Sequence, residues 1–316
     1  MKKINPSFSC ARCKDAACIG SGGRARCEKH FIGEFGREVR RTVREFSMIR
    51  AGERVAVALS GGKDSVVLLH QLAELKERLP MELSAILVEE GIANYRAPTI
   101  QVARRECKKL GVKLRIVSFK SETGRTLDSA LKQKKRGTGA CSFCGVFRRL
   151  LLNKAARRLK ADKLALGHNL DDAAQTVLLN LYRNEPARLA RFWPVSIEPQ
   201  ENLIPRIRPL IRIPEREVAL MAELQGYGIC HRSCPYAHEA MRQTVRSQLN
   251  EMEDRYPGTK KRIFGAWMEM EGKTGGVTKE TRRHPVRHCS ACGEPSSGEE
   301  CAACRMRRQF YKHPSR

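Results

Sequence analysis

Short apolar runs alternate with longer stretches of helical periodicity along the middle of the chain. The short runs have the length and β-branched content of buried strands, and they lie at 55–59, 83–88, 113–119 and 163–166. The apolar spacing of the longer stretches predicts helices at 66–79 and at about 98–110, 144–160 and 171–183. This alternation predicts an α/β fold with a parallel sheet covered by helices on both faces, and ligands at the carboxyl ends of the strands.

The segments on either side of this alternation differ in composition. A basic stretch at 34–50 predicts a helix that leads into the first strand, and helical patterns resume at 215–224 and at about 238–270. Between 185 and 214 the chain is rich in Pro and Arg, which disfavours regular elements and predicts a long, functional connection. A helical extension is therefore expected to follow the central domain.

The charge of the chain indicates a polyanionic partner. Sixty Lys and Arg residues against 34 Asp and Glu residues give a net charge of +26. A field of that sign attracts nucleic acid in a salt-dependent way, although a generally basic proteome would produce the same excess. Only 6% of the residues are aromatic, which disfavours a base-stacking platform for single strands, so folded RNA is the better match.

The apolar runs predict a soluble, cytoplasmic protein with no membrane partner. The N-terminal sequence MKKINPSFSCARC lacks the apolar core of a signal peptide, and no run approaches the roughly 18 apolar residues of a membrane-spanning helix. In an intracellular chain, thirteen cysteines argue for metal binding or redox chemistry rather than for a disulfide framework.

Two sets of four soft ligands stand at the two ends of the chain. Each set consists of two short pairs, the arrangement of tetrahedral structural zinc. The sets are Cys10, Cys13, Cys27 and His30, and Cys289, Cys292, Cys301 and Cys304. We therefore predict two Zn²⁺ ions and four regions: a zinc finger at 1–32, a central domain at 33–213, a helical extension at 214–283, and a zinc ribbon with a basic tail at 284–316. Cys18 and Cys107 have no evident partners and are expected to be ordinary buried residues.

The sequence VAVALSGGKDS at 55–65 joins the first predicted strand to the helix after it. Such a junction presents free backbone N–H groups, and Gly61 and Gly62 let an anion approach without a Cβ in the way. The loop therefore predicts a phosphate-binding site. It is not a Walker A loop, because Gly62 and Lys63 are followed by Asp64 and the earlier glycine of that motif is missing.

The string SGGKDS resembles the PP-loop of N-type ATP pyrophosphatases, which cleave ATP between the α and β phosphates to adenylate an oxygen. A second string, GHNLDD at 167–172, resembles the second motif of the tRNA-thiolating members. Its acidic residues could be plain helix caps, but beside an ATP site they also suit Mg²⁺. The resemblance implies an ATP pocket formed by Ala58, Leu59, Ser60, Gly61, Gly62, Lys63, Asp64, Ser65, Val88, Arg148 and Gly167. Val88 would contact adenine through its main chain, or it is simply a core valine.

A third cysteine set narrows this resemblance. Cys141 and Cys144 form a CxxC between the third and fourth predicted strands, and Cys234 precedes a proline far downstream. With the two zinc sets, this order resembles the tRNA 2-thiouridine synthetases of the TtcA/TtuA family, which include cytosolic tRNA 2-thiolation proteins. The resemblance implies a [4Fe–4S] cluster held by these three thiolates, with one iron left open for sulfur. A third zinc site or a persulfide-carrying dithiol would use the same cysteines, and Cys230 competes with Cys234 as the third ligand.

The implied reaction is the ATP-dependent 2-thiolation of a tRNA uridine. AMP is transferred to the uridine O2 with release of pyrophosphate, and sulfur then attacks C2 as AMP leaves. By the same resemblance Asp172 is the catalytic carboxylate, Lys63 stabilises phosphate charge, and Cys141 and Cys144 serve sulfur transfer. Bacterial relatives carry a lysine where this chain has Arg148, and an arginine does not give up a proton at neutral pH.

The sequence leaves several features of this enzyme open. The target is position 34 or 54 of tRNA, sulfur arrives as sulfide or from a ubiquitin-like thiocarboxylate protein, and a homodimer is implied only by the resemblance. Two other functions fit the same motifs. One is a different adenylating reaction on tRNA, such as cytidine 2-thiolation, and the other is zinc-dependent RNA binding without catalysis.

Overall fold

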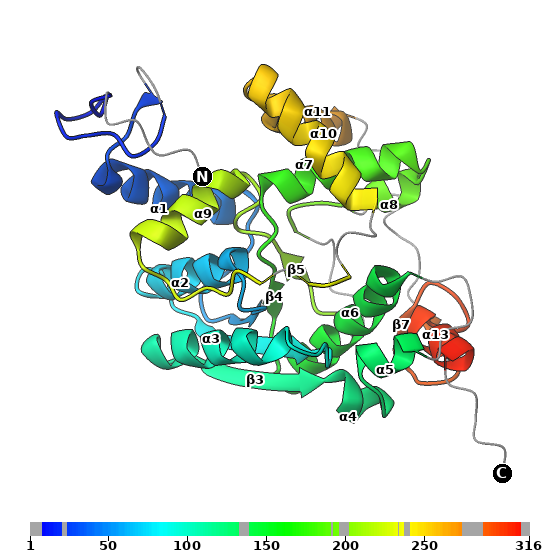
Figure 1. Cartoon of the computed structure of the whole chain (residues 1–316). Coiled ribbons are helices and arrows are strands. Elements are labelled where there is room, and N and C mark those ends of the chain that lie inside the picture. Colours follow the sequence, from blue (N-terminus) through cyan, green and yellow to red (C-terminus); the bar gives the residue numbers. More distant parts are fainter. Residues whose placement is uncertain are drawn as a thin grey trace, which may run out of the picture.

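A sheet of five parallel strands, in the order β3-β2-β1-β4-β5, forms the centre of the protein (Figure 1). The computed structural model describes residues 8–20, 24–132, 139–190, 192–195, 202–232, 234–236, 241–273 and 287–310. The strands are β1 Arg54–Ala58, β2 Glu82–Glu89, β3 Lys113–Ser118, β4 Lys163–Ala165 and β5 Arg206–Ile207. The predicted α/β class is confirmed. The strand order reverses between β1 and β4, which is where doubly wound proteins bind their ligands.

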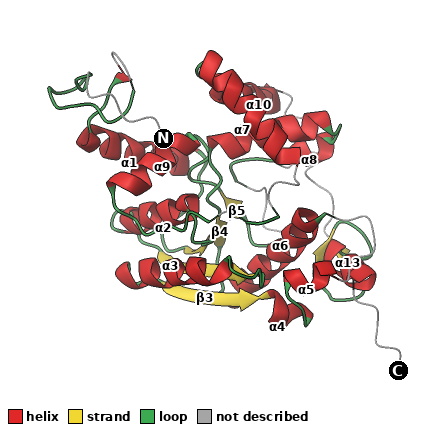
Figure 2. Ribbon diagram, viewed as in Figure 1, coloured by secondary structure: helices red, strands yellow, loops and turns green. Residues whose placement is uncertain are grey.

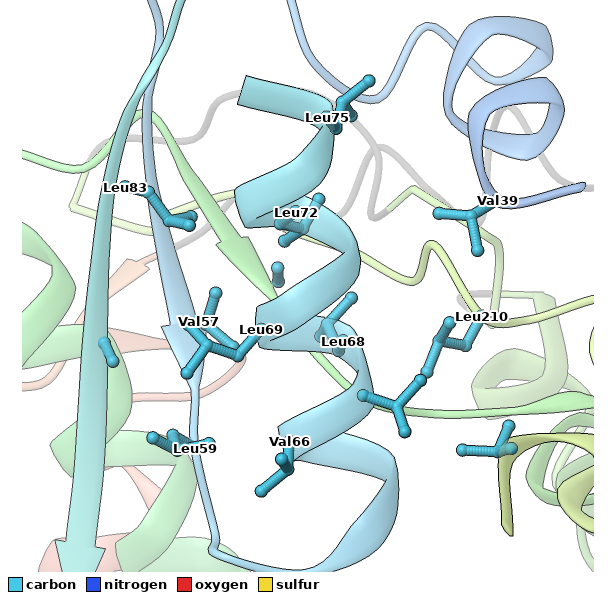
Figure 3. Close-up of a cluster of buried hydrophobic side chains, with 14 of the residues drawn as sticks. Val39, Val57, Leu59, Val66, Leu68, Leu69, Leu72, Leu75, Leu83 and Leu210 are labelled. Atoms are coloured by element: carbon cyan, nitrogen blue, oxygen red, sulfur yellow. The ribbon is translucent and has the colours of Figure 1, made fainter. Parts of the chain in front are cut away.

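Four helices pack against one face of the sheet: α1 Glu28–Glu45, α2 Lys63–Lys76, α3 Arg96–Lys109 and α9 Glu215–Leu224. Figure 3 shows α2 at the centre of this layer, with Leu69 on the side of Val57 in β1 and Leu68 on the side of Leu210. Ala56, between the inward valines of β1, belongs to the core of the opposite face, as the alternation of side chains along a strand requires. The apolar content of these elements therefore fixes the first strand and helix around the phosphate loop.

The opposite face carries α6 and the C-terminal metal module. Its elements are α4 Phe119–Thr123, α5 Leu127–Lys132, α6 Ala140–Arg158, β6 Arg287–His288, β7 Pro295–Ser296 and α13 Ala302–Phe310. Phe143 and Phe147 of α6 are fully buried beneath this layer, and Cys301 packs into the same core. An ion pair between Arg157 of α6 and Glu294 attaches the module to the domain. The last described residues of the predicted basic tail are thus part of a helix.

The helical extension packs on α7 Leu170–Tyr182, the helix that follows β4. Its helices α10 Met241–Arg255 and α11 Thr259–Lys273 group with α7 and α8 Pro186–Ala190 at the top of Figure 1. Figure 2 shows the same group of helices coloured by secondary structure. The helical pattern predicted at about 238–270 forms two helices, which are divided at Pro257 and Gly258. Pro257 lacks an N–H, and Gly258 has a φ of 91°, which a helix does not tolerate. Glu253 caps the new start by accepting the amides of Gly258 and Lys260 at 2.7 and 2.8 Å. Residues 238–240 lie outside the described part.

Two helix starts differ from prediction in ways that affect the metal sites. α1 begins at Glu28 rather than at 34, with Cys27 as N-cap, so the second pair of the first zinc set forms its first turn. α6 begins at Ala140 rather than at 144, so Cys141 is helical as well. The short strand β5 was not predicted, since two residues carry no periodicity. No helix in the described ranges has the length and apolar content needed to cross a bilayer.

Candidate active site

The loop after β1 owes its shape to glycines and serines. Gly61 has a φ of 82°, and a Cβ there would lie 2.5 Å from the carbonyl oxygen of Thr99, so only glycine fits. The amide of Ser60 donates to Oγ of Ser65 at 3.0 Å, and the two hydroxyl oxygens are 2.9 Å apart. α2 starts directly after Gly62, which has no side chain to cap the helix. The first amides of α2 can therefore bind phosphate.

Lys63 lies between two carboxylates beside these amides. Its Nζ is 2.9 Å from Oδ2 of Asp64 and 2.7 Å from Oε1 of Glu215 on α9. Burial disfavours the charged ammonium, but the two carboxylates outweigh it and raise the pKa of Lys63. Glu215 also binds Arg246 of α10 at 2.9 Å. Lys63 is thus a fixed cation at the loop, and the helical extension reaches it through Glu215.

The GHNLDD segment packs directly on the phosphate loop. A Cβ on Gly167 would lie 3.0 Å from the carbonyl carbon of Asp64, so the absence of a side chain lets the two segments touch. Asn169 donates from Nδ2 to Oδ1 of Asp64 at 2.9 Å. Its own Oδ1 accepts the amide of Asp172 at 3.0 Å, and the two residues form a capping box at the start of α7. The two sequence motifs therefore meet through Asn169, a contact that the sequence did not reveal.

The carboxylate of Asp172 contacts both the N-cap residue of α7 and an arginine of α10. Its Oδ2 accepts the amide of Asn169 at 3.3 Å, and Oδ1 lies 3.3 Å from Nη1 of Arg242 on α10. Burial raises the pKa of Asp172 to about 6, with Arg242 opposing and the nearby Asp64 adding to the shift. A carboxylate of this pKa can accept a proton in a reaction near neutral pH, and with Asp64 it offers oxygen ligands suited to Mg²⁺.

Asp171, the other acidic residue of the motif, makes structural contacts. Its Oδ2 accepts the amide of Glu215 at 2.8 Å, and its Oδ1 pairs with Lys260 of α11. Lys260 also donates to Oδ1 of Asn250 at 2.7 Å. Asp171 therefore ties α7 to α9 and α11.

Cys141 and Cys144 lie in the first two turns of α6. Cys144 is buried, and burial raises the pKa of its thiol to about 11 against the opposing charge of Arg148. Nη2 of Arg148 donates to Sγ of Cys144 at 3.2 Å. Cys141 is exposed, and its thiol donates to the carbonyl oxygen of Tyr236 at 3.4 Å. That contact brings the segment containing Cys234 to the same end of α6.

Cys234 and Cys230, the two candidates for the third cluster ligand, pack on opposite faces of the sheet. Cys234 packs against the core that contains Cys144, and the two are close enough for their charges to interact. Cys230 packs against the other core, donates its amide to the carbonyl oxygen of Gly61 at 3.0 Å, and lines a cavity of about 590 Å³ beside Arg105 of α3. This placement favours Cys234, and the ligand set stays a prediction.

The donor set at α6 suits a cluster better than a third zinc ion. Among the described residues, only the two terminal sets gather their ligand atoms within 4.8 Å of one another. A cubane cluster spreads its thiolate ligands farther apart than a single ion does, so the wider spacing of these three thiols is compatible with a cluster. The third zinc site is therefore disfavoured.

Glu90 connects the thiol to the phosphate loop. It is 0% exposed and directly follows β2. Its Oε1 accepts Nε of Arg148 at 2.9 Å and Nη2 of Arg96 at 2.6 Å, and Nη1 of Arg96 donates to the carbonyl oxygen of Ser60 at 3.2 Å. One buried carboxylate thus holds one guanidinium at Cys144 and another at the loop. Sequence analysis missed Glu90, whose only signal is an acidic residue between a buried strand and a glycine.

The remaining residues of the predicted ATP pocket are core residues at strand ends. Leu59 is 1% exposed and its amide donates to the carbonyl oxygen of Ile86 at 2.8 Å. Val88 is 4% exposed and pairs with Val117 of β3, whereas the ladder between β1 and β2 ends at Ala58 and Ile86. The main-chain groups of Val88 that face β1 therefore have no ladder partner in β1, and they can contact a nucleotide. Its side chain is part of the core.

Both terminal sets have the dimensions of a zinc site. Sγ of Cys27 lies 3.6 Å from Sγ of Cys13 and 3.2 Å from Nδ1 of His30, and Sγ of Cys292 lies 3.8 Å from Sγ of Cys301. A tetrahedral ion with bonds of about 2.3 Å would separate its ligands by about 3.8 Å. The donor atoms of both sets therefore fit Zn²⁺.

Comparison with known proteins adds sequence and structural relatives. The PP-loop domain family matches residues 34–253. The chain is 34% identical over 314 residues to the tRNA 2-thiolation protein NcsA of Haloferax volcanii, covering 95% of this chain and 98% of that protein. It is 35% identical over 285 residues to the cytoplasmic tRNA 2-thiolation protein 1 of Drosophila melanogaster, covering 89% and 81%. The solved U34-tRNA thiolase NcsA from Methanococcus maripaludis with its [4Fe–4S] cluster superposes with a TM-score of 0.80 and 32% identity over 98% of this chain and 97% of that one.

Proposed function

The chain belongs to the PP-loop family and, within it, to the tRNA 2-thiolation proteins, and from this we propose that it thiolates a tRNA uridine at C2 with consumption of ATP. One observation carries the proposal: the phosphate loop and the thiol of Cys144 are bridged by Arg96, Glu90 and Arg148. An enzyme that adenylates an oxygen and then replaces it with sulfur needs both groups at one site.

In the first step the uridine O2 attacks the α-phosphorus of ATP, and pyrophosphate leaves. The amides at the start of α2 and the ammonium of Lys63 would neutralise charge on the departing phosphates. Asp64 and Asp172 would hold Mg²⁺ at these oxygens. Asp172 can also accept the N3 proton of the uracil, which becomes acidic once O2 carries the adenylate.

In the second step sulfide attacks C2, the bond to the adenylated oxygen breaks, and AMP leaves. The cluster, when held by Cys141, Cys144 and Cys234, would supply an open coordination position for the sulfur. Arg148 donates to Cys144 and would stabilise negative charge on its sulfur. Because a guanidinium keeps its proton, Arg148 acts here by charge and position rather than as an acid.

We assign the two terminal sets to structural Zn²⁺ and the predicted division at 1–32, 33–213, 214–283 and 284–316 to the corresponding functional regions. The partner is tRNA, and the name of the Methanococcus maripaludis relative supports position 34 as the target. The names of the animal relatives support a cytoplasmic location. Sulfide or a ubiquitin-like thiocarboxylate as sulfur donor, and a homodimer, complete the proposal.

Anaerobically purified protein incubated with tRNA, ATP and sulfide tests this function. We expect AMP and pyrophosphate in equal amounts, and a uridine that gains sulfur in nucleoside mass spectrometry. Lys63→Met should lower the rate by about 100- to 1,000-fold, as loss of a preorganised electrostatic contact does. Lys76→Met, at the exposed far end of the same helix, should not. Sulfur on cytidine would identify the other thiolation reaction, and no AMP in the presence of tRNA would leave an RNA-binding protein without catalysis.

A further inference from the structure

Three helices begin next to one another at the phosphate loop. α2 starts at Lys63 directly after the loop, α9 starts at Glu215, and α7 starts at Leu170. Nζ of Lys63 donates to Oε1 of Glu215 at 2.7 Å, and the amide of Glu215 donates to Oδ2 of Asp171 at 2.8 Å. The positive ends of three helix dipoles therefore meet at this place, which favours negative charge.

The helix α10 directs two arginines at the same place. Arg242 and Arg246 are four residues apart, and they share the face of α10 that packs on α7. Val245 and Leu249, on this face, are 1% and 2% exposed. Nη2 of Arg242 donates to Oγ1 of Thr176 in the second turn of α7 at 3.1 Å. The packing of α10 on α7 therefore sets the position of both guanidinium groups.

Arg246 shares a carboxylate oxygen with the lysine of the phosphate loop. Its Nη2 donates to Oε1 of Glu215 at 2.9 Å, and Nζ of Lys63 donates to the same oxygen at 2.7 Å. The two cationic nitrogens are therefore closer to each other than two hydrogen-bond lengths. A phosphate bound at Lys63 is thus within reach of a guanidinium carried by the helical extension.

Arg242 contacts the acidic residue on the other side of the loop lysine. Its Nη1 lies 3.3 Å from Oδ1 of Asp172, whose charge also interacts with that of Asp64. Asp64 in turn accepts a hydrogen bond from Nζ of Lys63 at 2.9 Å. The lysine therefore lies between Arg242 and Arg246 in one series of alternating charges.

ATP with its Mg²⁺ would change the balance of this network. Its cations and carboxylates are equal in number: Lys63, Arg242 and Arg246 against Asp64, Asp172 and Glu215. Mg²⁺ held by Asp64 and Asp172 would compete with Arg242 for the same carboxylate. ATP carries more negative charge than one Mg²⁺ neutralises, so its phosphates need further cations, and the two guanidinium groups can supply them.

We propose that Arg242 and Arg246 bind the β- and γ-phosphates of ATP and hold the pyrophosphate as it leaves. This assignment rests on the proposed function and makes the helical extension part of the nucleotide site. As the uridine O2 bonds to the α-phosphorus, the bond to the bridging oxygen breaks and its electron pair goes to the pyrophosphate. A guanidinium offers two parallel donors to phosphate oxygens, so it can neutralise this growing charge.

Calorimetric titration without tRNA tests the site, with Mg²⁺ and either ATP, pyrophosphate or AMP as the ligand. Arg242→Gln and Arg246→Gln should each weaken the binding of ATP and of pyrophosphate by about 10- to 100-fold, as loss of a charged hydrogen bond does. The binding of AMP should not change, because AMP lacks the β- and γ-phosphates. Arg246→Lys should lose less affinity than Arg246→Gln, since a lysine keeps the charge without the fork.

Arg255→Gln is the matched control. Arg255 lies in the last turn of α10, at the opposite end from Arg242, and pairs with Glu251 at 2.8 Å, so the variant breaks an ion pair of the same helix. All three ligands should bind this variant as they bind wild type. The side chains of Arg242 and Arg246 are 45% and 43% exposed, so their variants should also fold, and melting temperatures check this.

The outcomes separate this site from the proposed reaction. Unchanged ATP and pyrophosphate affinity in either variant would remove that arginine from the site. An equal loss of AMP affinity would overturn the assignment, since it would show only a general effect of the charge. So would weaker tRNA binding with wild-type ATP affinity, because the arginines would then bind the RNA.

Thiolation is measured on the same samples. A wild-type protein that binds pyrophosphate through the two arginines but forms no thionucleoside keeps the site and loses the proposed function. A protein that thiolates tRNA, while both variants bind pyrophosphate as wild type does, keeps the function alone.

Discussion

Glu90 accepts a hydrogen bond from Nε of Arg148 at 2.9 Å, and this contact sets the guanidinium that touches Cys144. The same carboxylate pairs with Arg96, which donates to the phosphate loop. A single fully buried acid therefore positions groups at the nucleotide end and at the sulfur end of the site. Because Glu90 is fully buried and both of its carboxylate oxygens pair with Arg96 and Arg148, its role is positioning.

Replacing Glu90 with Gln should disturb both ends at once. The substitution leaves two guanidinium groups without their shared charge, and breaking a buried ion pair lowers the free energy of unfolding by about 3–5 kcal/mol. Urea unfolding measures this loss, and calorimetric titration should show weaker ATP binding. Glu89→Gln is the matched control, since Glu89 is adjacent in sequence and partly exposed, and it makes no ion pair in the described structure. Wild-type ATP affinity in the Glu90→Gln variant, together with an unchanged electron paramagnetic resonance signal of its cluster, would contradict the positioning role.

The pH dependence of the reaction should report Asp172. If the carboxylate form is required, kcat/KM should fall tenfold per pH unit below about 6, rather than below the ordinary 3.8. Asp172→Asn should remove this limb and lower the rate by about 100- to 10,000-fold.

The stability of the same variant should change in the opposite direction. A raised pKa means that the folded protein binds this proton more tightly than the unfolded chain does, so the ionised group destabilises the fold as the pH rises through about 6. Asp172→Asn should therefore melt at a higher temperature than wild type at neutral pH. An equal or lower melting temperature would argue against a penalty for ionising Asp172.

Cys234 and Cys230 should differ in cluster content. Cys141→Ala, Cys144→Ala and Cys234→Ala should each lose iron and acid-labile sulfide, because each removes one of three thiolate ligands. Cys230→Ala should retain both, since Cys230 packs on the opposite face of the sheet. Iron and sulfide analysis of anaerobically purified variants measures this, and the converse pattern between Cys230 and Cys234 would exchange their roles.

The two zinc sets should have unequal effects on the α6 site. Cys10→Ser and Cys301→Ser should each lower the zinc content from two ions to one and lower the melting temperature, because a structural ion contributes folding free energy. Only Cys301→Ser should also reduce cluster occupancy, since Cys301 packs in the core that contains Cys144. Zinc and iron analysis on the same samples tests this, and equal iron loss in both variants would show that the effect is not transmitted through that core.

Local patterns in the chain were sufficient for the order of the elements and for the phosphate loop. Apolar spacing predicted β1 and α2, and the glycines between them predicted the anion site, because strands, helices and tight turns depend on neighbouring residues. The ligand spacing of the zinc sets was equally local. Local signals did not separate the two helices at Pro257 and Gly258, and they missed the two-residue strand β5.

Contacts between distant segments were decided only by the tertiary structure. The bridge from Ser60 to Cys144 through Glu90, the link between Lys63 and Glu215, and the contacts of the α10 arginines each join residues far apart in sequence. A sequence shows that Glu90 is acidic, but not that packing will bury it between two guanidinium groups. Burial and pairing determine the charge and position of such groups, and both arise only when the sheet and its two helical layers assemble.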